Sequence, residues 1–251
     1  LLIGTALALV REFTDEGYPE AAAMEADLGV PIIATFPPGA DDKRYIVTDP
    51  DCPPELRDAF MGLLLNLRFA NRGKMVTPVL LTSARSRNDM GWMAYNLGLT
   101  AARTGKRVVV LDCNLRQPSL QEVAELTQSL GLAEVLCGRE GVDKVVQWNT
   151  CGTGYLGTLP AGSLDPSVGP AFVWDSDVFS NVIHELSQDS ELIVIAAPAV
   201  LDYPDALAIS SRCGGVALAL RKSVARSDAR EATEALWRTE VPLLGLVVSE
   251  D

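Results

Sequence analysis

The sequence has few of the side chains that commonly hold metal ions or form disulfides. Its 251 residues include one histidine, His184, and five cysteines. The cysteines are scattered, and none of them forms a Cys-x-x-Cys pair. An odd, dispersed set suits a reducing cytosol better than a disulfide framework, and it gives no zinc-site spacing. We therefore expect no metal site.

The sequence also lacks an apolar run long enough to cross a bilayer, which takes about 20 residues. The opening LLIGTALALV covers only residues 1–10. It is either the start of a buried helix or the cytoplasmic end of a truncated transmembrane helix. Arg11, directly after it, favours the second because positive residues flank the cytoplasmic side. We accordingly assign residues 1–50 to a membrane-proximal helix and linker, and residues 51–251 to an α/β domain.

Positive charge is scarce. The formal net charge is −12 and the sequence pI is near 4.6. Such a chain repels the phosphate backbone on average, so no nucleic-acid partner is predicted. The composition is 48% hydrophobic, which is ordinary for a globular protein with a substantial core.

Short apolar runs alternate with helical patterns through most of the chain. The runs lie at residues 78–84, 107–113, 191–198, 215–221 and 242–249, and helical patterns lie at 91–104, 119–130, 176–188, 204–212 and 225–239. Upstream, residues 11–29 and 55–73 have helical patterns, and VPIIATFPP at 30–38 is a short β-rich segment. Strands that are apolar throughout predict a mainly parallel sheet covered by helices on both faces. Residues 137–170 have no clear pattern, and we expect one short strand and surface loops there.

Ligands of such sheets bind beyond the carboxyl ends of the strands, so the junction TSARSRNDMGW at residues 82–92 needs explanation. A nucleotide loop of the form [GA]-x-x-x-x-G-K-[ST] would begin at Ala84. Its second glycine would then be Asp89, its lysine Met90 and its hydroxyl residue Gly91. Each change removes a function, because the glycine admits the phosphates, the lysine neutralises their charge and the hydroxyl binds Mg²⁺. Arg85 and Arg87 could still attract an anion, but we interpret both as solvated loop residues.

Two further strand ends carry information. Asp112 follows the run VVVL and could orient water or Mg²⁺, or it could cap a turn. A metal-assisted phosphoryl-transfer site would need an acid directly after the run LIVI, where Ala196 and Ala197 stand.

The order of these segments resembles the cytoplasmic domain of bacterial tyrosine kinases (BY-kinases) in the polysaccharide co-polymerase, or Wzz-type chain-length determinant, family. The matching segments are LTSA (81–84), AYNLGLTAARTGKRVVVLDCNLRQP (94–118), GLAEVLCG (131–138), LPAGSLDP (159–166), APAVLDYPDALAIS (197–210) and ALRKSVARSDAREA (219–232). The resemblance implies a three-layer fold like that of P-loop NTPases, located at the inner face of the bacterial plasma membrane.

The departures from the family pattern are as systematic as the matches. The phosphate loop P-G-E-G-K-[ST]-[ST] of the family would fall on Ser86, Arg87, Asn88, Asp89, Met90, Gly91 and Trp92, and none of them matches. The second acid of the motif that retains Asp112 is Asn114, and the acid of the third motif aligns with Ala196. The ring-assembly motif E-x-x-R-x-x-R falls on Asp58, Met61 and Leu64, and a tyrosine-rich tail is missing.

The main hypothesis is therefore a pseudokinase: a non-catalytic domain without cofactor, which regulates exopolysaccharide or capsule assembly by contacting other subunits and synthesis or export proteins. The alternative is an active tyrosine autokinase that binds ATP and Mg²⁺ through unusual residues such as Arg85, Arg87 and Asp112. A partition or division ATPase of the MinD type is a third class with the same sheet pattern.

Overall fold

The computed structural model describes residues 17–70, 73–86, 90–164, 169, 173–174 and 176–250. Eight strands form one sheet in the spatial order β1-β8-β7-β2-β6-β3-β5-β4. The strands are β1 (Ile32–Phe36), β2 (Val79–Ser83), β3 (Arg107–Asp112), β4 (Gln147–Cys151), β5 (Gly154–Leu159), β6 (Leu192–Ala196), β7 (Gly215–Arg221) and β8 (Leu243–Ser249). Every neighbouring pair is parallel except the hairpin β4–β5.

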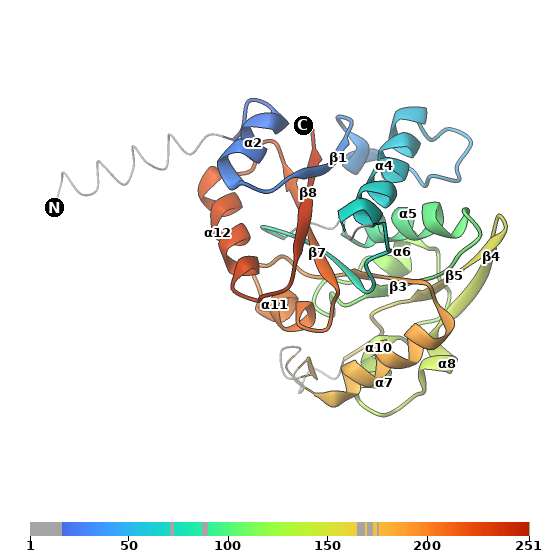
Figure 1. The fold of residues 1–251 in the computed structure, drawn as a ribbon. Coiled ribbons are helices and arrows are strands. Elements are labelled where there is room, and N and C mark those ends of the chain that lie inside the picture. The colour runs from blue at the N-terminus through green and yellow to red at the C-terminus, as the bar shows by residue number, and fades with distance from the viewer. Residues whose placement is uncertain are drawn as a thin grey trace.

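Helices cover both faces of this sheet, as Figure 1 shows. They are α2 (Ala21–Leu28), α3 (Ala40–Lys43), α4 (Pro54–Ala70), α5 (Met90–Ala102), α6 (Leu120–Val123), α7 (Leu132–Leu136), α8 (Val142–Val145), α10 (Asp177–Asp189), α11 (Asp205–Ser210) and α12 (Arg226–Trp237). α4 and α5 pack on one face, and α12, α10, α7 and α8 lie on the other. The predicted three-layer, mainly parallel fold is confirmed.

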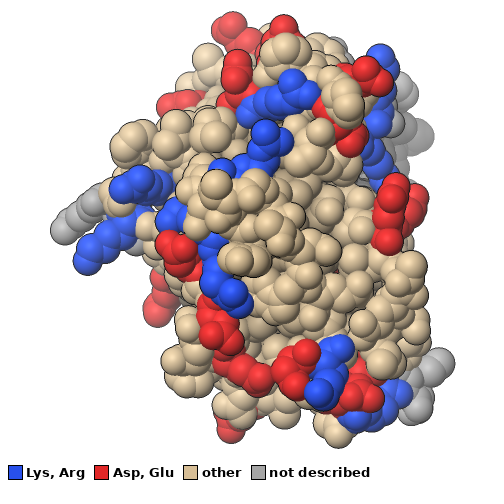
Figure 2. Space-filling view, turned by 90° about the vertical axis from the view of Figure 1, so that its right-hand side faces the viewer, with Lys and Arg blue, Asp and Glu red and all other residues tan. Residues whose placement is uncertain are grey.

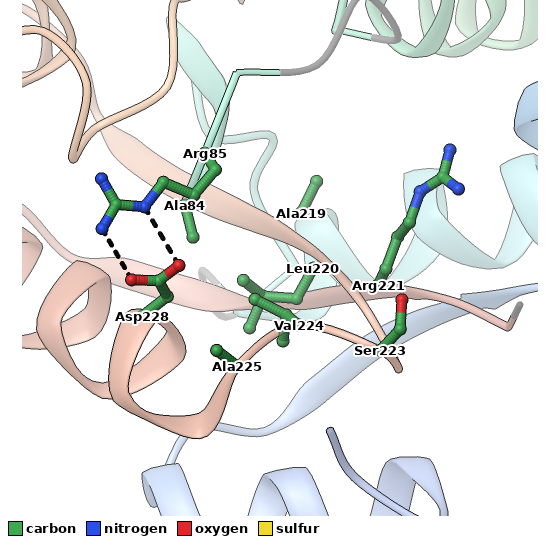
Figure 3. Close-up of a pocket in the computed structure, with 9 residues that line it drawn as sticks. All are labelled: Ala84, Arg85, Ala219, Leu220, Arg221, Ser223, Val224, Ala225 and Asp228. Carbon is green, nitrogen blue, oxygen red and sulfur yellow. Dashed lines mark hydrogen bonds and ion pairs between the residues drawn. The ribbon is translucent and has the colours of Figure 1, made fainter. Parts of the chain in front are cut away.

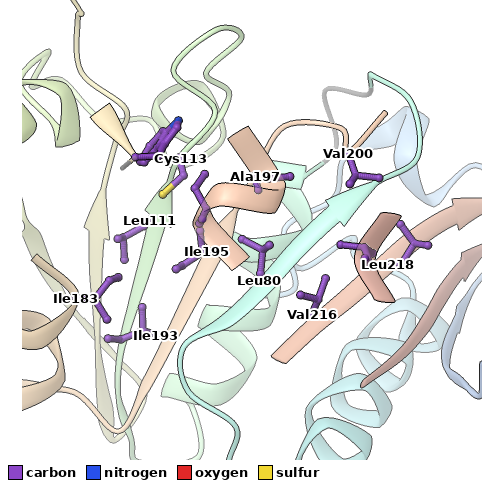
Figure 4. Packing of buried hydrophobic residues seen from close by; sticks show 14 of the residues in the cluster. Leu80, Leu111, Cys113, Ile183, Ile193, Ile195, Ala197, Val200, Val216 and Leu218 are labelled. Carbon is purple, nitrogen blue, oxygen red and sulfur yellow. The ribbon is translucent and has the colours of Figure 1, made fainter. Parts of the chain in front are cut away.

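Strands that are buried on both faces supply two separate core clusters. In β2, Leu80 packs on the α10 and α12 side, while Val79 and Leu81 pack on the α4 and α5 side. Figure 4 shows Leu80 beside Ile195 and Val216, which come from the two neighbouring strands. This two-sided burial explains why the strands are apolar at every position instead of at alternate ones.

Helix α4 shows the other pattern that the sequence predicts. Its five core residues share one face at helical spacing, and all are buried: Leu56, Phe60, Leu63, Leu64 and Leu67. The first described helix, α2, begins only at Ala21, so the helical pattern over 11–29 extends beyond the observed helix. The apolar run 1–10 and Arg11 lie outside the described residues.

Three features differ from the sequence-based expectation. The helix expected over 119–130 is limited to Leu120–Val123, and Glu125 has a left-handed φ of 50°. Only Leu120 of this segment is fully buried, so there is little packing to support a longer helix. Residues 137–170 contain two strands, β4 and β5, instead of one. Finally, β1 lies within the segment assigned to the linker and pairs with β8 at the edge of the sheet.

Among the described helices, none combines the length and apolar character that a bilayer crossing requires.

Candidate functional site

The site to examine lies where four neighbouring parallel strands end. β7, β2, β6 and β3 are adjacent in the sheet, so the loops that follow them meet at its carboxyl edge. Ligands bind at this edge in open parallel sheets. The predicted phosphate loop follows β2, Asp112 is the last residue of β3, and Ala196 is the last residue of β6.

The loop after β2 is tied to the loop after β6 by backbone hydrogen bonds. The amide of Val200 donates to the carbonyl of Ser83 at 2.9 Å, and the amide of Leu201 donates to the carbonyl of Ala84 at 3.2 Å. The Ser83 hydroxyl donates to the carbonyl of Arg85 at 2.8 Å. The backbone direction of residues 83–85 is therefore fixed by contacts within the protein.

Arg85 is exposed, as expected for a solvated loop residue, and it also forms ion pairs within the protein. Its Nε and Nη2 donate to the two carboxylate oxygens of Asp228 at 3.0 and 2.7 Å, and Nη1 lies 3.3 Å from Asp202 Oδ1. The bidentate pair with Asp228 is visible in Figure 3. These hydrogen bonds to Asp228 raise the pKa of the guanidinium. Asp228 lies 143 residues away in the sequence, so no local pattern could predict this pairing.

Ser86 donates two hydrogen bonds, from its amide and its hydroxyl, to the carboxylate of Asp202. Its amide nitrogen lies 2.5 Å from Asp202 Oδ2, and its hydroxyl contacts the same oxygen. Burial alone would raise the pKa of Asp202, but the hydrogen bonds from Ser86 and the charge of Arg85 lower it overall. Asp202 therefore stays ionised. It accepts a hydrogen bond from the Ser86 amide, a loop N–H that a bound phosphate group would need.

A small hollow lies between the ends of β2 and β7 and the start of α12. Its volume is about 210 Å³, and its walls are mostly apolar, with Arg85 and Asp228 at one side (Figure 3). Pockets for drug-sized ligands usually measure about 300–1,000 Å³, so this hollow is small for a nucleotide.

The first residues of α5 face the core instead of the site. Met90, in the lysine position of the expected motif, is only 3% exposed. Trp92 is fully buried and donates from Nε1 to the carbonyl of Tyr45 at 2.8 Å. Its ring packs edge-on against Phe60 and Phe36, with centroid distances of 5.3 and 6.3 Å. Trp92 therefore packs α5 against α4 and β1, and Met90 belongs to the same core cluster.

Gly91, in the position of the Mg²⁺-binding hydroxyl, touches the loop after β3. A Cβ atom at Gly91 would overlap the Ser119 hydroxyl and lie 2.9 Å from the Leu120 amide nitrogen. A serine or threonine at this position therefore requires that loop to move. The space beside the second residue of α5 is filled by protein.

Asp112 holds the same loop in place. Its carboxylate is fully buried and accepts hydrogen bonds from the amides of Asn114, Ser119 and Leu120 at 2.8–2.9 Å. Burial raises the pKa of Asp112, and the three N–H donors oppose that shift by stabilising the ionised form. Of the two roles considered for Asp112, the geometry matches turn capping.

The end of β6 offers no acid to a ligand. Ala196 and Ala197 are buried, and their backbones bond to Cys113 and Leu81. The next acid but one, Asp205, is 2% exposed and is paired with Arg116 at 2.6 Å. The guanidinium groups of Arg85 and Arg116 are thus directed at carboxylates of the protein.

Arg87, Asn88 and Asp89 lie outside the described residues. Within the described ranges, no group of three or more His, Cys, Asp or Glu side chains is arranged to hold a metal ion.

The positions of the ring-assembly motif on α4 divide between surface and core. Leu64 is buried, whereas Asp58 and Met61 are exposed. Met61 is followed at intervals of four residues by Leu65 and Phe69, which are also exposed. These three side chains, here called the α4 row, form an apolar stripe on the outer side of the helix.

No protein-family model matches the chain. Individual relatives do match: it is 25% identical over 193 residues to the tyrosine-protein kinase YwqD of Bacillus subtilis, covering 76% of this chain and 80% of YwqD. It is 24% identical over 223 residues to the tyrosine-protein kinase Ptk of Acinetobacter johnsonii, covering 84% of this chain. Among solved structures, the chimerical protein CapA2B2 superposes with a TM-score of 0.81 at 22% identity, over 92% of this chain and 98% of that one. The kinase domain of the Escherichia coli tyrosine kinase ETK gives 0.79 at 19% identity, over 92% and 94%.

The chain is a BY-kinase-like domain. The likeness to MinD of Pyrococcus horikoshii is weaker and less complete, with a TM-score of 0.57 over 68% of each chain. This BY-kinase-like domain spans most of YwqD but only 30% of the length of Ptk. At the strand ends described above, Met90 and Trp92 lie in the core, and Arg85 and Arg116 form ion pairs within the protein.

Proposed function

We propose that this domain is a pseudokinase: the non-catalytic cytoplasmic domain of a polysaccharide co-polymerase at the inner face of the bacterial plasma membrane. It would regulate the chain length, polymerisation or export of an exopolysaccharide or capsule through protein–protein contacts. No cofactor is part of this proposal.

The observation that carries the proposal is the packing at the start of α5. The lysine position, Met90, faces the core, and the hydroxyl position, Gly91, is closed by Ser119 and Leu120. Without these two groups, neither the phosphate charge nor Mg²⁺ has its usual partner.

Electrostatics at the loop after β2 support the same conclusion. Asp202 and Asp228 place two carboxylates beside the single guanidinium of Arg85. A phosphate charge at about 4 Å from one such carboxylate is repelled by roughly 4 kcal/mol at an effective dielectric constant near 20. Because the two carboxylates outnumber the single guanidinium, the cluster as a whole stays negative and does not offset that repulsion.

The α4 row supports the protein-contact part of the proposal. Met61, Leu65 and Phe69 are 38%, 43% and 68% exposed, although all three are large apolar side chains. A continuous exposed apolar stripe marks protein-interaction surfaces more often than isolated apolar residues do. We propose other subunits of the same membrane assembly, or polysaccharide synthesis and export proteins, as its partners.

The alternative is an active tyrosine autokinase with an atypical ATP–Mg²⁺ site, which the names of YwqD and Ptk favour. Incubation of the purified domain with radiolabelled ATP and Mg²⁺ separates the two functions. The pseudokinase predicts no label on the protein and no released phosphate. Labelled tyrosine that disappears in the Asp112→Asn variant, with the variant still folded, would support the autokinase and overturn the proposal.

A further inference from the structure

The two edge strands of the sheet, β1 and β4, differ in how their outward backbone N–H and C=O groups are covered. At β1, side chains cover the open edge: Glu25 Oε2 accepts from the amide of Ile32 at 3.2 Å, and Asn66 Nδ2 donates to the carbonyl of Ile33 at 2.7 Å. Pro31 and Pro37 flank the strand and limit its extension. Natural proteins commonly protect edge strands in these ways, because unpaired N–H and C=O groups attract other chains.

At β4, the corresponding groups are open. β4 and β5 are joined by the two-residue turn Gly152–Thr153, with Gly152 at a φ of 62°, so Cys151 and Gly154 form a hydrogen-bonded pair. Antiparallel pairs alternate, and the N–H and C=O groups of Trp148 and Thr150 therefore point away from β5. In the described part of the chain, no side chain or loop forms a hydrogen bond with them.

The side chains of β4 do not discourage pairing either. The strand reads Gln-Trp-Asn-Thr-Cys, with no charge, no proline and no bulge in its register with β5. Trp148, Asn149 and Thr150 are all exposed. Aromatic and β-branched residues favour strand pairing, and gatekeeping lysine or proline is absent from residues 147–151.

A hollow lies beside this open edge on the α5 side. It measures about 480 Å³ and is lined by Tyr95, Leu99, Arg103, Asn149 and Leu156, among others. Arg103 also lines a second hollow of about 210 Å³ that reaches Met61 on α4. Within the described residues, no carboxylate pairs with Arg103. A side chain projecting from an added strand toward the α5 face would enter the larger hollow and meet this guanidinium.

The opposite face of the same edge carries two aromatic rings, those of Trp148 and Tyr155, beside Arg107. The Arg107 guanidinium lies over the ring of Trp148 at 4.5 Å and that of Tyr155 at 5.4 Å, so it holds both rings in place. Figure 2 views the molecule from the side where β4 lies in Figure 1, and the middle of that face is mostly uncharged. Alternate side chains of an added strand would thus meet the hollow on one face and the aromatic rings on the other.

We propose that the β4 edge binds an extended segment of a partner polypeptide as a ninth strand, with an acidic side chain of that segment placed beside Arg103. Main-chain hydrogen bonds to Trp148 and Thr150 give the affinity, and Arg103 gives the preference for acid. This surface is separate from the nucleotide positions, and its test uses no nucleotide.

The test uses capped nine-residue peptides of alternating valine and threonine, with one central position occupied by Glu, Gln or Lys. Binding is followed by Trp fluorescence and calorimetry. The Glu peptide is expected to bind about 2- to 5-fold more tightly than the Gln peptide, since Arg103 is exposed and solvent screens its ion pairs. In Arg103→Gln, the Glu and Gln peptides should bind equally. If Arg103 only stabilised the C-terminal end of α5, Arg103→Gln would lower the stability of the domain but leave the ratio of the Glu-peptide and Gln-peptide affinities unchanged.

Two further measurements test the strand pairing itself. Thr150→Pro removes an outward N–H, which an edge strand tolerates, and should weaken binding at least about 10-fold, whereas Thr150→Val keeps the N–H and the affinity. In the unaltered protein, the amides of Trp148 and Thr150 should exchange with deuterium more slowly when the peptide is bound. No binding of any peptide, or unchanged exchange at both amides in the bound state, would overturn the proposal.

Discussion

Gly91→Ala tests whether the hydroxyl position of the expected nucleotide loop is closed by protein. The added Cβ would overlap the Ser119 hydroxyl, which can rotate, and would lie 2.9 Å from the Leu120 amide nitrogen, which cannot. That loop is held by the buried carboxylate of Asp112 through both residues. Overpacking of this kind costs about 1–3 kcal/mol, and the helix gains up to about 1 kcal/mol from replacing glycine. We expect a net loss of about 1–2 kcal/mol in the free energy of unfolding.

Gly62→Ala provides the matched control. Gly62 also lies within a helix, α4, but a Cβ there meets no atom within 4 Å. This variant should gain about 0.5–1 kcal/mol from helix propensity alone. Urea denaturation of the two variants and the unaltered domain measures both effects. If Gly91→Ala is as stable as Gly62→Ala, the loop after β3 does not close the site and the reasoning fails.

Three further predictions follow from the same contacts. Met90→Lys buries an ammonium group in the core, so it should lower the free energy of unfolding by several kcal/mol in urea denaturation, without creating ATP affinity. Met90→Leu should lower it by less than about 1.5 kcal/mol. A stable Met90→Lys variant would place that side chain outside the core. Arg85→Ala should cost about 1 kcal/mol at neutral pH, because the Arg85 side chain is 51% exposed and its ion pairs are screened. The pKa of Asp202 is lowered in the folded protein. The contribution of the Arg85 ion pairs to stability is therefore fully present above the pKa of the unfolded Asp202 carboxyl, and it is lost as the pH falls through the pKa of the folded one. A stability difference between Arg85→Ala and the unaltered domain that persists in strong acid would contradict the pairing. Phe69→Ser should change stability by less than about 0.5 kcal/mol but weaken cross-linking to the other proteins of the membrane assembly, and unchanged cross-linking would remove the α4 row as a contact surface.

The sequence allowed the sheet and most of its helices to be predicted because burial on both faces leaves a strong signal. Five uninterrupted apolar runs became the central strands, and the leucine and phenylalanine spacing of α4 matched its buried face. The early end of α6 and the second strand of the β4–β5 hairpin were missed. In both segments the outcome depends on tertiary contacts: the lack of packing beyond Leu120 for α6, and pairing with β3 for β5.

The candidate site could be located from the sequence, but its interior could not. The register of the expected loop puts Met90 and Gly91 at the lysine and hydroxyl positions, but the pattern gave no reason to place Met90 in the core or Gly91 against Ser119. The ion pair of Arg85 could not be predicted, because Asp228, its bidentate partner, is distant in sequence. Pairings of this kind depend on the fold and leave no local spacing to read.

Titration of the domain with ATP and Mg²⁺ by isothermal calorimetry tests the central claim most directly. The control is the double variant Asp202→Asn, Asp228→Asn, which removes both carboxylates around Arg85 without touching the start of α5. With Met90 in the core and Gly91 closed by Ser119 and Leu120, we predict no heat of binding for either protein up to about 1 mM nucleotide, a ceiling of about −4 kcal/mol in affinity. Saturable binding of ATP–Mg²⁺ by the unaltered domain at micromolar concentration would contradict the account.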